Sequence, residues 1–344
     1  MADYVQIPYG QIALKAVLPA LLYFTGIFIS VHLEAKKLGL RGLPREELPK
    51  LLPLLKKSYL LLPLALLIYL VGTSQKSIQY AAALSIVACV FVTLFSRETR
   101  ITPMRILEAL AAGGQGSITV AAACGIAGII AGTITMTGLA NVIINGIVVL
   151  AGNSVLIALF LTMICCIVLG MGVPTTATYC IMAATCAPIL VRMGVPLVAA
   201  HFFVFYFGIV ADLTPPVALA AYAGAAIAQA NPMKTALEST KLAIGAFIVP
   251  YAFAFSPSML LIDTTAAEVI LIVITSLVGI ASVSAAMEGY LVGELSWPRR
   301  ALALVGGLMM IYPGTVTDVI GLALSGLVVV LCLADKKKAA PAAA

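Results

Sequence analysis

Long apolar stretches separated by short polar segments occupy most of this sequence. A helix needs about 20 residues to cross the hydrocarbon core of a bilayer, because each residue adds a rise of ~1.5 Å. The pattern therefore predicts a series of membrane helices. The expected spans are 14–33, 58–71, 77–95, 118–139, 154–191, 198–228, 243–255, 269–286 and 301–333.

Three of these spans contain helix-breaking residues, which predict hairpins or unwound helices in place of simple spans. We expect block 154–191 to form a re-entrant hairpin that enters and leaves the membrane on one side. Block 198–228 is expected to be one broken transmembrane helix. Block 301–333 is expected to be a shallow hairpin, split at 312–318 into apolar arms of 11 and 15 residues.

The composition agrees with a membrane protein, because 62% of the residues are hydrophobic, 10% are charged and the mean hydropathy is +1.13. A soluble globular domain carries far more charge. Continuous runs of Leu, Ala, Ile and Val also exclude a porin-like barrel, whose strands alternate between apolar and polar residues. The predicted fold class is an all-α polytopic membrane protein.

Basic residues gather on one face once the loops are assigned alternately to the two sides of the membrane. The positive-inside rule makes that face cytoplasmic, with the N-terminus of this sequence periplasmic and its C-terminus cytoplasmic. A hairpin and a pair of full spans return to the same face, so the charges leave both possible for block 154–191. The basic residues of this face lie in loop 34–57, at 97–105, at Lys234 and Lys241, at Arg299 and Arg300, and at 336–338, and the exceptions are Lys15, Lys76 and Arg192.

Spans and charges together divide the sequence into six parts. Residues 101–114 carry apolar residues at helical spacing beside Arg105 and Glu108, which predicts an amphipathic helix in the membrane plane, with a short polar connector as the alternative. The six parts are transmembrane helices with the basic loop (1–97), the interfacial helix (98–115), a transmembrane helix and connector (116–153), the hairpin with the broken helix (154–230), two transmembrane helices (231–287), and a short hairpin with a basic tail (288–344).

The first break lies in residues 169–190, LGMGVPTTATYCIMAATCAPIL. Such a tip is tolerated in a membrane only where protein or a watery cavity surrounds its backbone. Pro174, Thr175 and Thr176 suit the first turn of a new helix, whose positive dipole end can face an anion. The predicted binding residues of this segment are Gly170, Gly172, Pro174, Thr175, Thr176 and Thr178.

The second break places Asp212, Thr214, Pro215 and Pro216 inside an apolar block. Thr214 is the expected N-cap and Pro215 the expected first residue of the second half-helix. The first half-helix, ending near Val210, should leave carbonyl groups unsatisfied, and these groups with Asp212 and Thr214 are natural ligands for Na⁺. A single break is usually a packing kink, whereas two neighbouring breaks rich in hydroxyls favour an ion-coupled solute site.

Other chemistries lack their motifs in this sequence. There is no P-loop, no HExxH and no GxSxG, so we predict no enzyme, and the energy for transport must come from an ion gradient or a partner. The seven cysteines lie in apolar runs and are interpreted as core residues, not as disulfides or metal ligands. His201 is interpreted as an ordinary partly buried histidine. Na⁺ is the expected coupling ion, and no cofactor is expected.

Four long stretches carry a family resemblance. They are IPYGQIALKAVLPALLYFTGIFISVHLEAKKLGLRGLPREELP from Ile7, SRETRITPMRILEAL from Ser96, GMGVPTTATYCIMAATCAPILVRMGV from Gly170, and HFFVFYFGIVADLTPPVALAAYAGAAIAQANPMKTALESTKLAIGAFIVPY from His201. These stretches resemble the large membrane (permease) subunit of tripartite ATP-independent periplasmic (TRAP) transporters, particularly the fused permeases of the TAXI type.

The resemblance implies an elevator-type secondary transporter of the cell inner membrane, driven by Na⁺ symport. Its expected substrates are organic acids, dicarboxylate-like solutes, delivered by a TAXI-type periplasmic solute-binding protein, and a small membrane subunit is a further expected partner. In the family, two inverted repeats each supply a hairpin and an unwound helix to the site. Residues 170–178 match the second hairpin tip, and 212–217 match the second unwound helix. The resemblance also implies that 154–230 is one half of a transport domain and that the helices of 1–97 are of the scaffold type.

The first repeat has no counterpart in this sequence, which therefore resembles the C-terminal half of the family pattern. We expect another polypeptide to supply the first repeat, or the sequence to be a truncated product. The alternative function is a non-transporting membrane scaffold or assembly subunit derived from such a permease. An ion channel is less expected, because the sequence shows neither a repeated filter nor a ring of charges.

Overall fold

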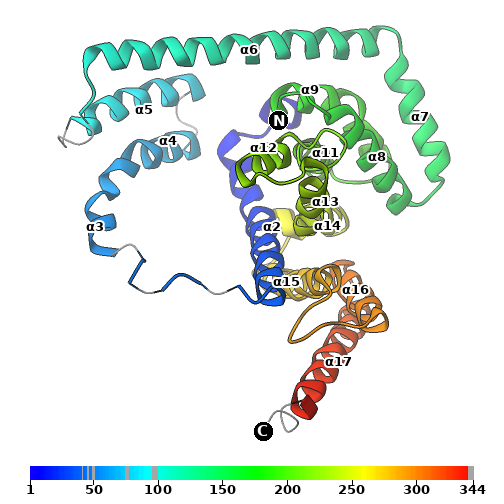
Figure 1. Cartoon of the computed structure of the whole chain (residues 1–344). Coiled ribbons are helices and arrows are strands. Elements are labelled where there is room, and N and C mark those ends of the chain that lie inside the picture. The colour runs from blue at the N-terminus through cyan, green and yellow to red at the C-terminus, as the bar shows by residue number, and fades with distance from the viewer. Residues whose placement is uncertain (41, 45, 49–50, 74–76, 95–99, 340–344) are drawn as a thin grey trace. The chain divides into compact units, whose positions relative to one another are not determined.

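In a computed structural model of the protein, most of the described residues lie in helices (Figure 1). The structure describes every residue except 41, 45, 49–50, 74–76, 95–99 and 340–344. Across these described residues, extended pairing is limited to one isolated bridge between Tyr290 and Glu294. The predicted all-α class is confirmed.

The helices have the following bounds. They are α1 (Ala2–Val5), α2 (Tyr9–Lys37), α3 (Leu51–Lys56), η1 (Ser58–Leu61), α4 (Leu62–Gly72), α5 (Ile78–Thr93), α6 (Pro103–Met136), α7 (Leu139–Ala151), α8 (Val155–Gly170), α9 (Thr175–Thr185), α10 (Ala187–Arg192), α11 (Leu197–Val210), α12 (Leu219–Ala228), α13 (Pro232–Leu242), α14 (Ile244–Phe255), η2 (Pro257–Leu260), α15 (Ala266–Glu288), α16 (Trp297–Ile311) and α17 (Thr315–Ala339).

The chain divides into two compact units. The first, Met1–Leu14 with Arg41–Ala123, contains α3, α4 and α5, and in it α4 packs against α5. The second, Lys15–Leu40 with Cys124–Ala344, contains most of α2 and every helix from α7 onward. Both predicted breaks lie in the second unit.

Three helices among the described residues are long and apolar enough to cross a membrane. They are α2, α15 and the Thr315–Asp335 part of α17. Residues 124–136 and 139–151 meet the same test together but are bent by 71° at the break between them. These helices agree with the predicted polytopic membrane protein, and α2 and α15 cover the spans predicted at 14–33 and 269–286.

The middle of the chain corrects two sequence predictions. Residues 103–136 form the single helix α6, so the interfacial helix predicted at 98–115 is not a separate helix. The span predicted at 118–139 contains the break between Met136 and Leu139, where the chain bends. The physical reason is that Leu and Ala on both sides of the glycines favour the helix, and their propensity outweighs the cost of Gly113, Gly114 and Gly116. Whether any part of α6 lies in the membrane plane stays a prediction.

The C-terminal block is split as predicted, but its second arm is longer than expected. The break falls at residues 312–314, and α17 begins at Thr315. Thr317 donates to the carbonyl of Gly314 at 2.7 Å, and the amide of Asp318 donates to the same carbonyl at 2.9 Å. These polar residues form the first helical turn instead of a loop, so α17 is long enough to cross a membrane.

Helix α13 was not predicted. Its side chains are mostly polar, so the pattern of apolar runs does not predict it. The signal was nevertheless present, because Asn231 caps the helix by accepting from the amide of Lys234 at 3.1 Å, and Pro232 occupies the first turn.

Some predictions fall on residues that the structure does not describe. They concern Arg41, Arg45, Lys50, Lys76 and Arg97 in the charge assignment, and the proposed boundary between residues 97 and 98.

An aromatic core holds the second unit together. The rings of Phe203 and Phe207 on α11 pack against Tyr251 on α14, with centroid distances of 5.4 and 6.1 Å. Phe202 similarly meets Phe253 at 6.2 Å. Helix α11, which precedes the second break, is therefore fixed by tight packing.

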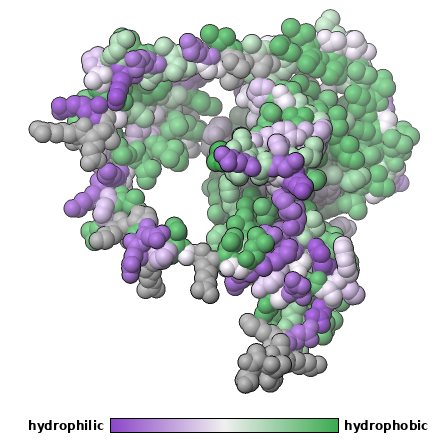
Figure 2. Space-filling model, in the orientation of Figure 1, coloured by the Kyte–Doolittle hydropathy of each residue, from purple (hydrophilic) through white to green (hydrophobic). Residues whose placement is uncertain are grey.

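Hydrophobic residues crowd the side formed by α7 and α8, whereas hydrophilic residues run along α13 (Figure 2).

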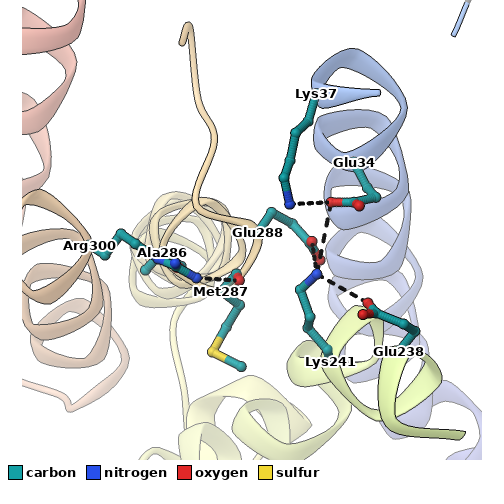
Figure 3. A network of polar contacts seen from close by, with 8 residues as sticks. All are labelled: Glu34, Lys37, Glu238, Lys241, Ala286, Met287, Glu288 and Arg300. Atoms are coloured by element: carbon teal, nitrogen blue, oxygen red, sulfur yellow. Dashed lines mark hydrogen bonds and ion pairs between the residues drawn. The ribbon is translucent and has the colours of Figure 1, made fainter. Parts of the chain in front are cut away.

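The end of α15 is closed by an arginine from α16. The Arg300 guanidinium donates to the carbonyls of Ala286 at 2.8 Å and Met287 at 2.9 Å, groups that a helix end leaves without partners (Figure 3). The same guanidinium lies 4.8 Å from the ring centroid of Trp297. Arg300 therefore fixes the α15–α16 corner.

We expect Arg300→Met to destabilise the protein by ~2 kcal/mol, because hydrogen bonds from charged groups contribute roughly 1.5–3 kcal/mol. Arg300→Lys should rescue little, since an ammonium cannot reproduce the planar two-donor geometry. The measurement is the Tm of the purified protein in detergent. Arg299→Met is the control, because Arg299 pairs with Asp335 at the surface and its loss should leave the Tm nearly unchanged. Equal Tm values for the Arg299 and Arg300 variants would contradict this role.

Candidate functional site

The hairpin predicted at 154–191 is observed as helices α8, α9 and α10. Its two ends meet, because residues 154–156 at the start of α8 and residues 193–195 after α10 line one cavity of about 470 Å³. Helix α10 also packs against α8. The structure thus brings the two ends of block 154–191 together, and the re-entrant hairpin stays a prediction.

The hairpin tip is a short turn between α8 and α9. Helix α8 ends at Gly170, Gly172 adopts a φ of +72°, and α9 begins at Thr175, so the predicted helix start at Pro174, Thr175 and Thr176 is confirmed. Thr178 closes the turn by donating its hydroxyl hydrogen to the carbonyl of Val173 at 3.0 Å. The tip is thus an ordered loop held by its own hydrogen bonds.

The N-terminus of α9 faces outward from this tip. Thr175 and Thr176 are exposed, and the preceding residue, Pro174, makes no side-chain cap hydrogen bond. The leading N–H groups of a helix have no partner within the helix, and the helix dipole adds positive potential there. The tip can therefore bind an anionic group through backbone amides and two hydroxyls.

The second break is a compact turn between α11 and α12. The amide of Ala220 donates to the carbonyl of Asp212 at 3.1 Å, and the amide of Ala218 donates to that of Thr214 at 3.1 Å. The Tyr222 hydroxyl donates to the carbonyl of Pro216 at 2.6 Å. These bonds fold residues 212–218 into a defined shape.

The start of the second half-helix corrects the sequence prediction. Helix α12 begins at Leu219, after Ala218 with a φ of +34°, so Thr214 is not its N-cap and Pro215 is not its first residue. The reason is that Thr214 and Pro215 belong to the turn, where the Thr214 hydroxyl donates to the carbonyl of Ala211 at 3.4 Å. Helical geometry resumes only after the turn has closed.

The carbonyl groups at the end of α11 are also more satisfied than predicted. The amide of Asp212 donates to Ile209 at 3.1 Å, and that of Leu213 donates to Val210 at 3.0 Å. Each carbonyl oxygen keeps a second lone pair. These oxygens can therefore still coordinate a cation, but they are not the unpaired groups that the sequence predicted.

The tip and the turn touch one another. A Cβ atom added at Gly170 would lie 2.9 Å from Cβ of Ala211 and 3.2 Å from the carbonyl oxygen of Gly208. A Cβ added at Gly172 would lie 3.8 Å from a methyl of Val217. The two breaks are therefore in direct contact. The approach at Gly170 leaves no room for a side chain, whereas the contact at Gly172 is an ordinary van der Waals distance.

The ten predicted site residues divide by exposure. Thr178 and Thr214 are buried inside the contact, and Gly170 is buried with them. The side chain of Asp212 is partly buried, and it is the only charged residue in segments 170–178 and 208–222. The residues exposed at the surface of the site are Gly172, Pro174, Thr175, Thr176 and Pro216, and Pro215 is intermediate.

His201 lies in the core beside the hairpin. It is 4% exposed, and its Nδ1 atom lies 2.8 Å from the Tyr179 hydroxyl. The side chain is more deeply buried than the sequence reading expected, and its bond with Tyr179 ties α11 to α9. The described residues contain no group of three or more His, Cys, Asp or Glu side chains placed to hold a metal ion.

A family model described as the DctM component of the tripartite ATP-independent periplasmic transporter matches residues 1–286. Searches of curated proteins and of solved structures gave no match. The matched residues include both broken elements and end within α15.

Proposed function

The chain belongs to the DctM family of tripartite ATP-independent periplasmic transporter components, and on that premise we propose that it binds an organic acid and Na⁺ where the hairpin tip meets the 211–218 turn. The family is one of transporters, so the chain is a permease subunit of the inner membrane and not an enzyme. A permease of this kind works with a periplasmic binding protein and a small membrane subunit.

The contact between Gly170 and Ala211 carries the proposal. Two broken helices in one transporter commonly provide amides for an anion and carbonyls for a cation. Here the exposed start of α9 supplies the amides, and the adjacent turn supplies carbonyls and a carboxylate. The opposite partial charges therefore lie next to each other, as coupled binding of a carboxylate and a cation requires.

Each group has a proposed role. The amides and hydroxyls of Thr175 and Thr176 hold a carboxylate of the solute. The carbonyls around Asp212 and Thr214 coordinate Na⁺, a hard cation that prefers oxygen ligands. Gly172 and Pro216 form the surface of the site, and Thr178 fixes the tip through its hydrogen bond to the carbonyl of Val173.

The same proposal covers the substrate class, the coupling ion, the type of binding protein, the transport movement and the orientation in the membrane. The solutes are dicarboxylate-like acids taken up by Na⁺ symport, and the binding protein is of the TAXI type. The hairpin and the α11–α12 element move together as an elevator. Lys and Arg on one face support a periplasmic N-terminus and a cytoplasmic C-terminus for this chain.

The test is uptake of ¹⁴C-labelled four- and five-carbon dicarboxylates in cells that carry the full transporter. Thr175→Val and Thr176→Val should each raise the solute KM about tenfold, because each removes a hydrogen bond to a charged group. Thr214→Val should raise the Na⁺ concentration for half-maximal uptake by a similar factor, roughly tenfold, because it removes the hydroxyl that bonds the Ala211 carbonyl and holds the Na⁺-binding backbone in place.

Thr133→Val is the matched control for these variants. The hydroxyl of Thr133 is exposed on α6 and donates only within its own helix, to Ile129 at 2.8 Å. Its replacement should leave both constants unchanged. Unaltered uptake in all three site variants would refute the assignment of the site, and uptake that ignores Na⁺ would refute the symport.

A further inference from the structure

Helix α13 lies between the solute site and an ionic cluster. One row of its residues packs against the second break, and another side chain, Lys241, reaches α2 and α15. Both contacts belong to the second unit. The helix is therefore placed to connect the shape of the turn with charges at the far ends of two other helices.

The row that faces the break follows helical spacing. Ala236 is fully buried and packs with Ala218 and Ala221 at the start of α12. Ala243, at the end of α13, clusters with Val210 at the end of α11, and Leu213 packs against them. Positions 236 and 243 are two turns apart on one face, so α13 lies alongside the whole turn.

A hydroxyl lies in the same row. The Thr240 Oγ1 atom is 2.9 Å from the carbonyl oxygen of Ala236 and 3.3 Å from that of Leu213. Its hydrogen is shared between the helix and the break. The backbone at Leu213, next to Asp212 and Thr214, is therefore in polar contact with α13.

Lys241 occupies the neighbouring face and anchors the helix. Its Nζ atom lies 2.7 Å from Glu288, 3.1 Å from Glu238 and 3.8 Å from Glu34 (Figure 3). Glu34 is in the last turns of α2, and the buried Glu288 is the last residue of α15. Negative charges at helix C-termini interact unfavourably with the helix dipoles. The Lys241 ammonium neutralises this negative charge, which would be destabilising if the buried Glu288 carboxylate had no positive partner.

The ammonium stays charged in this setting. Burial acts to lower the pKa of Lys241, but the hydrogen bonds to Glu288 and Glu238 and their negative charges outweigh it and raise the pKa above the usual lysine value. Lys37 also pairs with Glu34, at 3.2 Å, but both of these residues are on α2. Only Lys241 therefore ties α13 to this cluster among the ion pairs of the described residues.

We infer that Lys241 is a positioning residue for the solute site: by fixing α13 between Glu288 and Glu34, it holds the turn at Leu213 and Ala218 in its binding shape. This inference rests on the proposed function of the turn. If α13 moves away, Ala236 and Thr240 no longer support the backbone that carries Asp212 and Thr214.

The first arm of the test measures the position of α13 without transport. Ala221→Cys, buried against Ala236, serves as a reporter after the seven native cysteines are replaced by serine or alanine. A water-soluble maleimide should label it roughly tenfold faster with Lys241→Met than in the parent, because the local opening is more populated. Lys241→Arg and the control Lys37→Met should keep the parental rate.

The second arm measures dicarboxylate uptake with the same four proteins, without the reporter. Lys241→Met should raise the solute KM by roughly five- to tenfold with Vmax per transporter little changed, since the competent shape is less populated. Lys241→Arg should restore the parental KM. A merely stabilising salt bridge would lower the amount of folded transporter and leave KM as it was.

The outcomes separate the two ideas. Parental labelling with Lys241→Met overturns the anchoring of α13, and faster labelling with an unchanged KM overturns the positioning role. Absence of uptake in the parent itself counts against the proposed function, while the labelling rates still decide whether Lys241 anchors the helix. The Glu288→Met/Lys241→Met double variant guards against misfolding, because it leaves no unpaired charge at Glu288 and should label as fast as Lys241→Met.

Discussion

Gly170→Leu is expected to lower solute uptake by ~10- to 100-fold while the protein still reaches the membrane. The reason is the close approach between the hairpin tip and the second break. A Cβ at this position would already lie 2.9 Å from the Ala211 Cβ atom and 3.2 Å from the carbonyl oxygen of Gly208. A leucine would force the tip away from the turn, and overpacking of this kind costs about 1–3 kcal/mol, so uptake should fall by ~10- to 100-fold.

The measurement is the initial rate of labelled dicarboxylate uptake, normalised to transporter in the membrane. Gly170→Ala should give an intermediate loss, because its single carbon meets the same atoms. Gly224→Leu is the matched control, since Gly224 lies on α12 with no atom within 4 Å of an added Cβ. Normal uptake by Gly170→Leu would show that the tip and the turn need not touch for transport.

The second large effect concerns folding, at the crossing of α16 and α17. A Cβ at Gly321 would lie 2.6 Å from the carbonyl oxygen of Gly306 and 3.1 Å from the amide nitrogen of Met310. Both are backbone atoms that cannot rotate away. Gly321→Ala should therefore separate the helices, at a cost of ~3 kcal/mol, and lower the Tm in detergent by roughly 5–10 °C.

Gly326→Ala provides the control on the same helix. Gly326 is exposed, and an added Cβ there meets no atom within 4 Å. Alanine favours a helix over glycine by about 1 kcal/mol, so the Tm of this variant should stay equal or rise slightly. A Tm of Gly321→Ala that matches that of Gly326→Ala would mean that the two helices are not closely packed in the folded protein.

The contact at Gly170 lies within the part of the chain that matches the family model, whereas the contact at Gly321 lies outside it. Gly170 and Ala211 lie within the 1–286 match, whereas α16 and α17 lie beyond it. The C-terminal helices are nevertheless packed onto α15 by glycines, because a Cβ at Gly307 would lie 2.7 Å from the carbonyl oxygen of Gly279. Gly321→Ala thus tests the stability of a helix pair outside the family match, and Gly170→Leu tests the site within it.

The existence of both breaks could be predicted from residue types. Pro174 beside two threonines marked the start of α9, and Pro215 with Pro216 marked the interruption after α11. Local chemistry determines such features, because Pro lacks an amide donor and Gly removes side-chain restraints wherever they occur. The boundaries were less secure, since the turn after α11 closes through a bond from Ala220 to Asp212, eight residues apart.

Helix α13 cannot be predicted from apolar runs, because most of its side chains are polar. Its role depends on Ala236 meeting Ala221 and on Lys241 meeting Glu34, a residue about two hundred positions earlier in the chain. The sequence around Ala236 and Lys241 does not indicate which distant residues these side chains contact. The cap at Asn231 predicts a helix start, but it says nothing of what the helix supports.

The sequence by itself determined the class of this protein, its apolar helices and the two interruptions, because composition, helical length and the backbone preferences of Gly and Pro act locally. Only the tertiary structure decided that the interruptions touch at Gly170 and Ala211, that α6 runs unbroken into a 71° bend, and that α13 lies against the turn. These features depend on how residues far apart in the sequence pack against one another, and such packing is determined by the whole folded unit.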